Sequence, residues 1–284
     1  MKVLIPTDGS KYAKWAMGWV RGLPFAESPA VTVLHVTDIE TVRGPLMFQS
    51  VVAGAEPFVQ EEIRRVEART KRVLSDVRRQ MDLVNLKGTM LTARGSVSQT
   101  ILERASRRDG LIALGSRGLD ALDRFLVGSV STRVALHATC PVLIVKKSPR
   151  PLRRMVFATD GSKASAKALR FLSTKLRPQG PKGSGRVEII VVHVIPLLNS
   201  AELKEAGGQL AEASAAKLAK AGYVVRPMVR SGTPVDEILK VASSKKADLI
   251  VTGAKGMGSV ARLLLGSIST KLVQDGSCSV LLVR

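Results

Sequence analysis

The stretch Leu111-Ile112-Ala113-Leu114-Gly115-Ser116-Arg117-Gly118 is the most informative part of the chain, because it runs from an apolar segment directly into a glycine-rich turn. Nine residues after the turn, Gly128-Ser129 opens a helical pattern. Glycine lets the backbone approach a ligand closely, and a helix N-terminus presents free N–H groups and the positive end of its dipole to an anion. A strand, a glycine turn and a helix in this order therefore favour binding of a phosphate group.

The same pattern occurs again in the second half of the chain. Gly253-Ala254-Lys255-Gly256 follows the apolar residues 249–252, and Gly266-Ser267 comes after the same nine-residue spacing. Two copies at matched spacing indicate an internal duplication, and they favour nucleotide binding far more than one glycine-rich turn would. Further segments recur in the same order: residues 6–11 as 158–163, 33–36 as 191–194, 94–97 as 231–234, and 140–145 as 278–283.

Both halves resemble the universal stress protein family in its tandem two-domain form. The resemblance rests on the opening turn Pro6-Thr7-Asp8-Gly9-Ser10, the pair His35-Val36 and the glycine spacing, and it spans residues 1–147 and 153–284. It implies two Rossmann-like, doubly wound α/β domains, each with a five-stranded parallel sheet, packed as a pseudo-dimer. It also implies a site for ATP, or for AMP or ADP, with Mg²⁺. Members of the family without the glycine signature do not bind ATP, whereas this chain keeps the signature in both halves.

The apolar runs independently predict alternating strands and helices. They are short, continuous and rich in Val, Ile and Leu, which is typical of strands buried on both faces of a parallel sheet. Right-handed crossovers then lead to a doubly wound sheet, whose ligands bind beyond the carboxyl ends of the strands. In the first half we expect strands at 2–6, 30–36, 89–93, 111–116 and 142–146 and helices at 11–23, 57–84, 97–107 and 128–138, and the second half repeats this order.

We predict one adenine-nucleotide site in each half, at these strand ends. The glycines would let the backbone pass close to the ribose and the phosphates. The serines at or just after the helix N-terminus would donate hydrogen bonds to phosphate from their hydroxyl and N–H groups. The predicted contacts are Pro6, Thr7, Asp8, Val36, Gly115, Ser116, Arg117, Gly118, Gly128, Ser129, Val130 and Ser131 in the first half, and Ala158, Thr159, Asp160, Val194, Gly253, Ala254, Lys255, Gly256, Gly266, Ser267, Ile268 and Ser269 in the second.

Several of these residues have an alternative role. The resemblance places Asp8 against the adenine or ribose end of the nucleotide, but an Asp before Gly-Ser is also a common helix N-cap. Arg117 could neutralise phosphate charge, and an exposed loop cation explains it nearly as well. By resemblance alone, Val36 would contact the base through its backbone. We expect His35 to be a packed structural histidine rather than a catalytic one. The same alternatives apply to the matching positions of the second half.

Catalytic chemistry has little support in the sequence. The P-loop pattern, the H-E-x-x-H and C-x-x-C motifs and the G-x-S-x-G elbow do not occur, and no paired carboxylates recur near the glycine signature. We therefore predict no catalytic residues and no metal held by protein side chains alone, although slow ATP hydrolysis stays open. Three functions remain: a regulatory ATP-binding protein, a weak ATPase on the same site, and a basic scaffold for nucleic acid or acidic proteins.

The charge of the chain favours anionic partners. Lys and Arg number 44 against 23 acidic residues, a net charge of +21. The basic residues are spread out, and the densest group, between 64 and 79, lies on a helical pattern with a separate apolar face. A solvated helix face is the favoured interpretation, and aromatic residues, at 4%, are scarce for base stacking. Nucleic acid is thus open but not favoured, and any protein partner is unknown.

Composition agrees with two domains in one cytoplasmic chain. The 284 residues fit two domains of ordinary size, no apolar run is long enough to span a membrane, and the start lacks a signal-peptide pattern. Cys140 and Cys278 occupy equivalent positions, where we expect small buried side chains rather than a disulfide. Residues 37–57 are extra in the first half and predict either a lid or partner surface or a packed loop, and 178–185 predicts a flexible surface loop.

The last strands of the two halves predict how the halves assemble. Residues 142–146 and 280–284 are apolar and end their domains, so each would be an exposed sheet edge unless it is paired. We predict that they pair antiparallel across a pseudo-twofold axis, joined by the short linker 147–151. A homodimer of such pseudo-dimers stays open. Trp15 and Trp19 share one helix face and could contribute to it, although packing in the core is the favoured use.

Overall fold

The computed structural model describes residues 1–38, 56–106, 110–118, 127–178, 187–198, 200–256 and 265–284 of the chain. Most of the predicted lid segment 37–57, and all of the predicted surface loop 178–185 except its first residue, lie outside the described residues. Strands and helices alternate through both halves, as the apolar runs predict.

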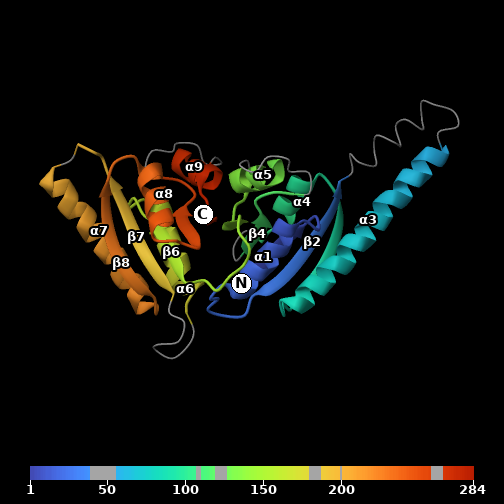
Figure 1. Ribbon diagram of the computed structural model, residues 1–284, viewed down its shortest axis with the longest axis horizontal. Coiled ribbons are helices and arrows are strands. Elements are labelled where there is room, and N and C mark those ends of the chain that lie inside the picture. Colours follow the sequence, from blue (N-terminus) through green and yellow to red (C-terminus); the bar gives the residue numbers. More distant parts are fainter. Residues whose placement is uncertain (39–55, 107–109, 119–126, 179–186, 199, 257–264) are drawn as a thin grey trace.

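The strands form a single ten-stranded sheet in the order β3-β2-β1-β4-β5-β10-β9-β6-β7-β8 (Figure 1). Every strand pair within a half is parallel, and the order reverses direction beside β1 and beside β6. This confirms the doubly wound α/β class and the five-stranded parallel sheet of each half. The strands are β1 (Lys2–Thr7), β2 (Ala30–Asp38), β3 (Thr89–Gly95), β4 (Gly110–Gly115), β5 (Val142–Val145), β6 (Arg154–Ala158), β7 (Glu188–Ile195), β8 (Val224–Ser231), β9 (Leu249–Gly253) and β10 (Ser279–Val283).

The helices cover both faces of the sheet. Side chains alternate along each strand, so that Val3 and Ile5 of β1 face one layer of helices and Leu4 faces the other. Helices α1, α3, α6 and α7 pack on the first face, and α4, α5, α8 and α9 pack on the second (Figure 1). The helices are α1 (Lys11–Gly22), α3 (Glu56–Leu83), α4 (Val97–Arg104), α5 (Ser129–His137), α6 (Lys163–Thr174), α7 (Ala201–Lys220), α8 (Pro234–Ser244) and α9 (Ser267–Asp275).

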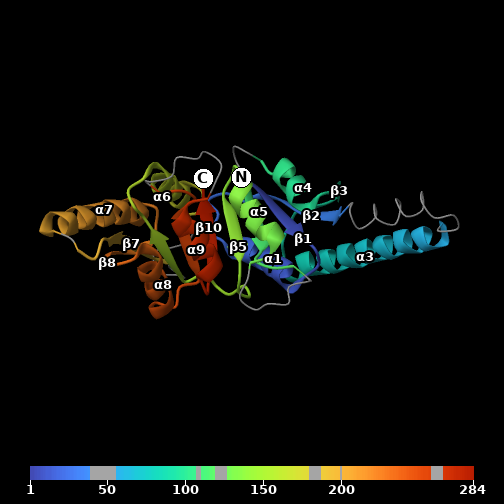
Figure 2. The same ribbon diagram turned by 90° about the horizontal axis from the view of Figure 1, so that it is seen from above.

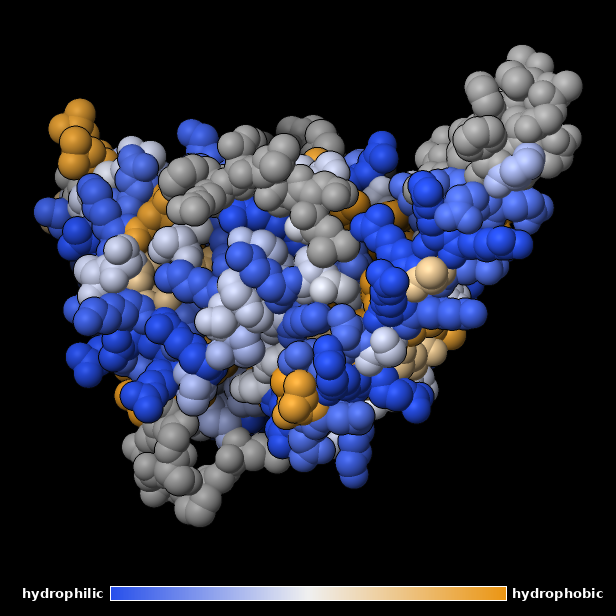
Figure 3. Space-filling model, turned by 45° about the vertical axis from the view of Figure 1, so that its right-hand side comes forward, coloured by the Kyte–Doolittle hydropathy of each residue, from blue (hydrophilic) through white to orange (hydrophobic). Residues whose placement is uncertain are grey.

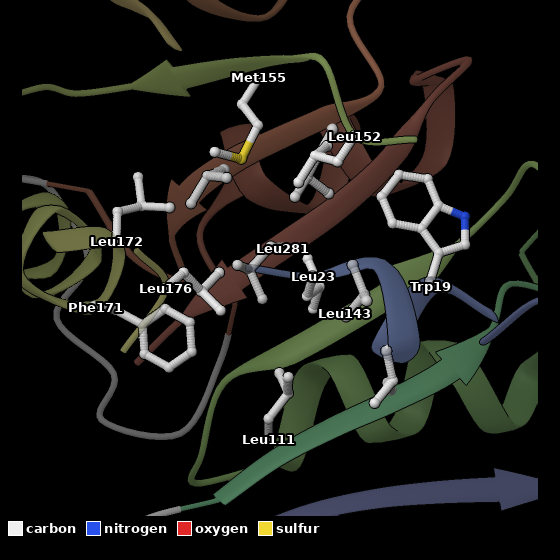
Figure 4. Packing of buried hydrophobic residues seen from close by; sticks show 14 of the residues in the cluster. Trp19, Leu23, Leu111, Leu143, Leu152, Met155, Phe171, Leu172, Leu176 and Leu281 are labelled. Atoms are coloured by element: carbon white, nitrogen blue, oxygen red, sulfur yellow. The ribbon is translucent and has the colours of Figure 1, made fainter. Parts of the chain in front are cut away.

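The two halves are joined through their last strands. β5 and β10 pair antiparallel, with Leu143 opposite Leu281, which confirms the predicted edge pairing. Both side chains are fully buried. Figure 4 shows them next to Leu23 of the first half and Leu176 of the second, with Leu152 and Met155 further away in the same cluster. The hydrophobic core is therefore continuous across the junction, and the halves pack as a pseudo-dimer around one pseudo-twofold axis (Figure 2).

The linker between the halves packs against α1. The indole N–H of the buried Trp19 donates to the carbonyl oxygen of Lys147 at 2.9 Å. At Gly18, an added Cβ would lie 2.5 Å from Pro149, so only glycine lets the linker pass this closely. Trp15, one turn earlier, is partly buried against the same core. Core packing, the favoured prediction for the tryptophans, is confirmed for Trp19.

The charged residues lie where the amphipathic pattern predicts. Among the described side chains of α3, Val73, Val77 and Met81 are buried, while Arg65 and Arg79 are exposed and pair with acidic residues of the same helix. Figure 3 shows a molecular face covered mostly by hydrophilic residues. The N-terminal part of α3 extends beyond the sheet in both ribbon views (Figures 1 and 2). None of the described helices is long and apolar enough to cross a membrane.

Candidate functional site

The glycine turn and the following helix meet at the carboxyl end of β4. The N–H of Gly128, which caps α5, donates to the carbonyl oxygen of Ser116 at 2.8 Å. In the second half the N–H of Gly266, which caps α9, donates to the carbonyl oxygen of Ala254 at the same distance of 2.8 Å. Each helix therefore begins directly on the turn that ends the neighbouring strand, as the sequence predicts.

A carboxylate from the first strand faces each turn. Asp8 follows β1, and one of its carboxylate oxygens accepts the N–H of Ser10 at 2.9 Å. The other oxygen lies 2.8 Å from the position that a Cβ on Gly118 would take. Asp160 repeats both relations with Ser162, at 3.0 Å, and with Gly256, at 3.0 Å. The structure thus brings together the aspartate and the glycine turn of each half, which lie about a hundred residues apart in the sequence.

Serine, and not aspartate, caps the first helix of each half. The hydroxyl of Ser10 accepts the N–H of Ala13 at 3.3 Å, and that of Ser162 accepts the N–H of Ser165 at 3.2 Å. The N-cap alternative for Asp8 and Asp160 is therefore wrong. Burial raises the pKa of Asp160, but hydrogen bonds from Ser162 and Ser165 outweigh it and hold the pKa below its usual value. A carboxylate held ionised in this way accepts hydrogen bonds and donates none.

The three glycine positions of each signature have different surroundings. A Cβ on Gly115 would lie 2.6 Å from Cβ of Tyr12, and one on Gly253 would lie 2.6 Å from the backbone of Ala164. These two glycines let the strand pack against α1 or α6. By contrast, a Cβ on Gly128 or Gly266 would make only contacts of 3.4 Å or more with the described protein, and both have ordinary φ angles, of −62° and −66°. Nothing within the described protein requires glycine at these helix caps.

The predicted serines divide into two kinds. Ser129 and Ser267, the first residues of α5 and α9, are exposed at the helix N-termini. Ser131 and Ser269 are buried, and their hydroxyls donate to the carbonyl oxygens of Gly115 and Gly253 at 2.7 and 2.8 Å. The structure therefore gives Ser131 and Ser269 the role of fixing the helix to the turn, a role that spacing alone does not indicate.

The two turns differ in their cation. Arg117 donates to the hydroxyl of Tyr12 at 2.9 Å, and its guanidinium carbon lies 5.6 Å from the centre of the Tyr12 ring. The position equivalent to Tyr12 in the second half is Ala164, as their matched contacts with Gly115 and Gly253 show. The second half thus has an alanine where the first half has this aromatic ring. Sequence reasoning missed Tyr12, although the difference between Tyr12 and Ala164 is visible once the two halves are aligned.

The histidines that precede Val36 and Val194 hold the strand ends together. Nδ1 of His35 donates to the carbonyl oxygen of Thr7 at 2.9 Å, and Nδ1 of His193 makes the same bond to Thr159, also at 2.9 Å. These matched bonds support the prediction of packed structural histidines. Val36 is buried at the end of β2, and Val194 is partly buried at the end of β7. Both lie just beyond the last paired residue of the adjacent first strand, beside the aspartate turn.

The two cysteines are buried side chains. Cys140 and Cys278 are free and buried, as predicted, and burial raises the pKa of the Cys140 thiol to about 11. Over the described ranges, no group of three or more His, Cys, Asp or Glu side chains is placed to hold a metal ion. What the described residues offer is a carboxylate acceptor, a glycine turn, a cation and a helix N-terminus, in both halves. Such groups suit a ligand with an anionic end and a hydrogen-bond-donating end.

Comparison with known proteins agrees with this architecture. A model of the universal stress protein family matches residues 1–146 and again residues 151–284. The chain therefore belongs to the universal stress protein family, in its tandem form.

Two relatives and one solved structure match this chain over nearly its whole length. A universal stress protein of Mycolicibacterium smegmatis is 26% identical, over 99% of this chain and 96% of that protein. The universal stress protein Slr1230 of Synechocystis is 24% identical, over 99% of both chains. The crystal structure of a universal stress protein from Archaeoglobus fulgidus superposes with a TM-score of 0.71 at 22% identity, covering 100% of this chain and 96% of that one. The last comparison establishes the tandem fold.

Proposed function

We propose that each half of this universal stress protein binds one adenine nucleotide, with its phosphates at the N-terminus of α5 or α9 and Mg²⁺ carried by the phosphates. The observation that carries the proposal is the pair of helix caps Gly128 and Gly266. Their φ angles suit any residue and no described neighbour would collide with a side chain there. Glycine at these positions keeps the space above the helix N-terminus open, which is what a phosphate needs.

The opposite end of the site suits the nucleoside. Asp8 and Asp160 lie across the turn from the helix caps and present carboxylate oxygens beside Gly118 and Gly256. Ribose hydroxyls and the adenine amino group are donors, and an ionised carboxylate is the matching acceptor. The resemblance to ATP-binding family members leads to the same placement. Since the phosphate and nucleoside ends differ in charge, one orientation of the ligand is favoured in each half.

Binding rather than turnover is the proposed role. Around the turns the described residues include glycines, serines, a cation and an aspartate, and one oxygen of each aspartate accepts a backbone N–H. These groups hold a ligand, and occupancy of the site would change the turns and helices around it. We therefore assign the protein a regulatory role, in which the bound nucleotide sets its conformation or its choice of partner.

The number of sites is tested by calorimetric titration of ligand-free protein with ATP and Mg²⁺. Both signatures are complete, so we expect a stoichiometry close to two per chain. A value close to zero would overturn the proposal, and a value close to one would restrict it to a single half.

The carrying observation is tested by Gly128→Ser and Gly266→Ser. Serine is a good N-cap, so each helix should stay stable, but its hydroxyl would take the backbone N–H that a phosphate needs. We expect roughly tenfold weaker ATP binding in the altered half, the effect of losing one hydrogen bond to a charged group. Gly208→Ser on α7 is the matched control, because nothing lies within 4 Å of a Cβ there. Unchanged affinity in both cap variants would contradict the phosphate assignment.

A further inference from the structure

Two cations cross the junction between the halves. Lys146 directly follows β5 in the first half, and its ammonium donates to the carbonyl oxygens of Gly276 at 2.6 Å and of Gln274 at 3.3 Å in the second half. Arg284 directly follows β10 in the second half, and its guanidinium donates to the carbonyl oxygens of Ala135 and Leu136 in the first half, the latter at 3.0 Å. The two contacts are related by the pseudo-twofold axis.

The acceptors lie at the carboxyl ends of particular helices. Gln274 and Gly276 end α9, and Ala135 and Leu136 lie in the last turn of α5. The last carbonyl groups of a helix lack partners within the helix and carry the negative end of its dipole, so a cation there is favourable. These are also the two helices whose N-termini form the proposed phosphate sites. Each is nine residues long, which is about 13 Å from one end to the other.

The residue before each cation is bound to the glycine turn of its own half. The N–H of Ser116 donates to the carbonyl oxygen of Val145 at 2.8 Å, and the N–H of Ala254 donates to that of Val283, also at 2.8 Å. Lys146 therefore directly follows the residue that is bound to the turn of the first half, and it lies one helix length from the proposed phosphate site of the second half. Arg284 has the reverse relation.

We propose that Lys146 and Arg284 are positioning residues, each of which holds the phosphate-binding helix of the opposite half in place and so couples the two nucleotide sites. The inference rests on the proposed function, because it assigns a second role to the same helices. A nucleotide that shifts the turn of one half moves the strand end that carries the cation. The cation in turn holds the far end of the helix that binds phosphate in the other half. By linkage, each nucleotide then changes the affinity for the other.

The test uses full-length protein in which a single site is intact. Gly118→Val should close the first-half site, because its Cβ would lie 2.8 Å from the Asp8 carboxylate and the rest of the side chain would fill the turn, so the proposed second-half site is the one left to titrate. Adding Lys146→Met should weaken ATP binding there roughly three- to tenfold, the range expected for a cation at a helix C-terminus. Adding Arg284→Met to the same protein should have a smaller effect. With Gly256→Val the pattern should reverse, so that Arg284→Met weakens binding and Lys146→Met does less. Lys146→Arg and Arg284→Lys, which keep the charge, should restore most of the affinity.

The outcomes separate this inference from the proposed function. If the single-site proteins do not bind ATP before the second substitution, the nucleotide sites themselves are wrongly assigned. If they bind ATP and the methionine variants act on both halves alike or on neither, the sites stand and the crosswise positioning is overturned. Amide hydrogen exchange without nucleotide gives a second measure, since Lys146→Met should speed exchange in α9 and leave α5 as the internal reference.

Discussion

At the scale of single residues, the glycines of each signature differ in what surrounds them. Gly115 and Gly253 lie at strand ends against the backbone or Cβ of the first helix of their half, whereas Gly128 and Gly266 have room for a side chain. A sequence signature gives all of these positions as glycine and does not show this difference between them. The first pair therefore serves packing between strand and helix, and we propose that the second pair leaves space for the phosphates of a nucleotide.

Gly115→Ala and Gly253→Ala should therefore destabilise the fold itself. Their Cβ atoms would lie 2.6 Å from atoms of α1 or α6, and forcing a methyl group into such a contact typically costs about 1–3 kcal/mol. Urea unfolding should show a lower midpoint for both variants. Gly208→Ala is the matched control, because a Cβ there meets nothing within 4 Å and alanine favours a helix, so its midpoint should stay or rise. Midpoints equal to that of the unchanged protein would contradict this prediction, since they would mean that α1 and α6 can move aside for the methyl group at no cost in stability.

At the scale of helices and strands, local sequence patterns predict most boundaries. The predicted helix 11–23 is α1 (Lys11–Gly22), and the predicted strand 142–146 is β5 (Val142–Val145). These elements could be predicted because apolar runs, helix-capping serines and glycines act within a few residues of the chain. The glycine turns and the aspartates could be placed in one site because the carboxyl ends of parallel strands meet at one edge of a sheet.

Contacts that depend on register across long separations could not be predicted. The bond between Arg117 and Tyr12 joins residues 105 positions apart, and that between Arg284 and Leu136 spans 148. Neither side chain carries a local signal for its partner. The hydroxyls of Ser131 and Ser269 likewise look available in the sequence, and only the packing of α5 and α9 shows that they bind Gly115 and Gly253.

We expect the stability of the protein to depend on pH through Lys146, whose ammonium group binds the carboxyl end of α9. Burial lowers the pKa of this lysine to about 8, among the charged or titratable neighbours Cys278, Asp275 and Arg117. A lysine in the unfolded chain titrates near pH 10.4, so between these values the unfolded chain binds more protons and stability rises with pH. The free energy of unfolding of the unchanged protein, relative to Lys146→Met, should therefore increase from about pH 7 to about pH 10. A constant difference across this range would contradict the lowered pKa.

At the scale of the whole molecule, the β5–β10 pair makes one sheet out of two domains. Residues 142–145 of β5 are fully buried, and the strand pairs with β4 of its own half on one side and with β10 of the other half on the other. A first half on its own would expose this apolar strand as a sheet edge.

Residues 1–147 expressed alone should therefore form a homodimer in which β5 pairs with its own copy. Sedimentation equilibrium at high micromolar concentration measures this directly. Leu143→Lys in the same fragment is the control, since a charge in the middle of the pairing strand should leave a monomer. A folded, monomeric unmodified fragment would show that the pairing of the halves depends on the linker rather than on the strands.

The antiparallel junction also sets the direction in which each half faces. Within a half all strands run the same way, and the two halves run in opposite ways, because β5 and β10 are antiparallel. The carboxyl ends of the strands, where the proposed sites lie, are therefore at opposite ends of the sheet along the strand direction. A flat partner surface that covers one site meets the amino ends of the strands in the other half. A single flat partner surface therefore cannot cover both proposed sites at the same time.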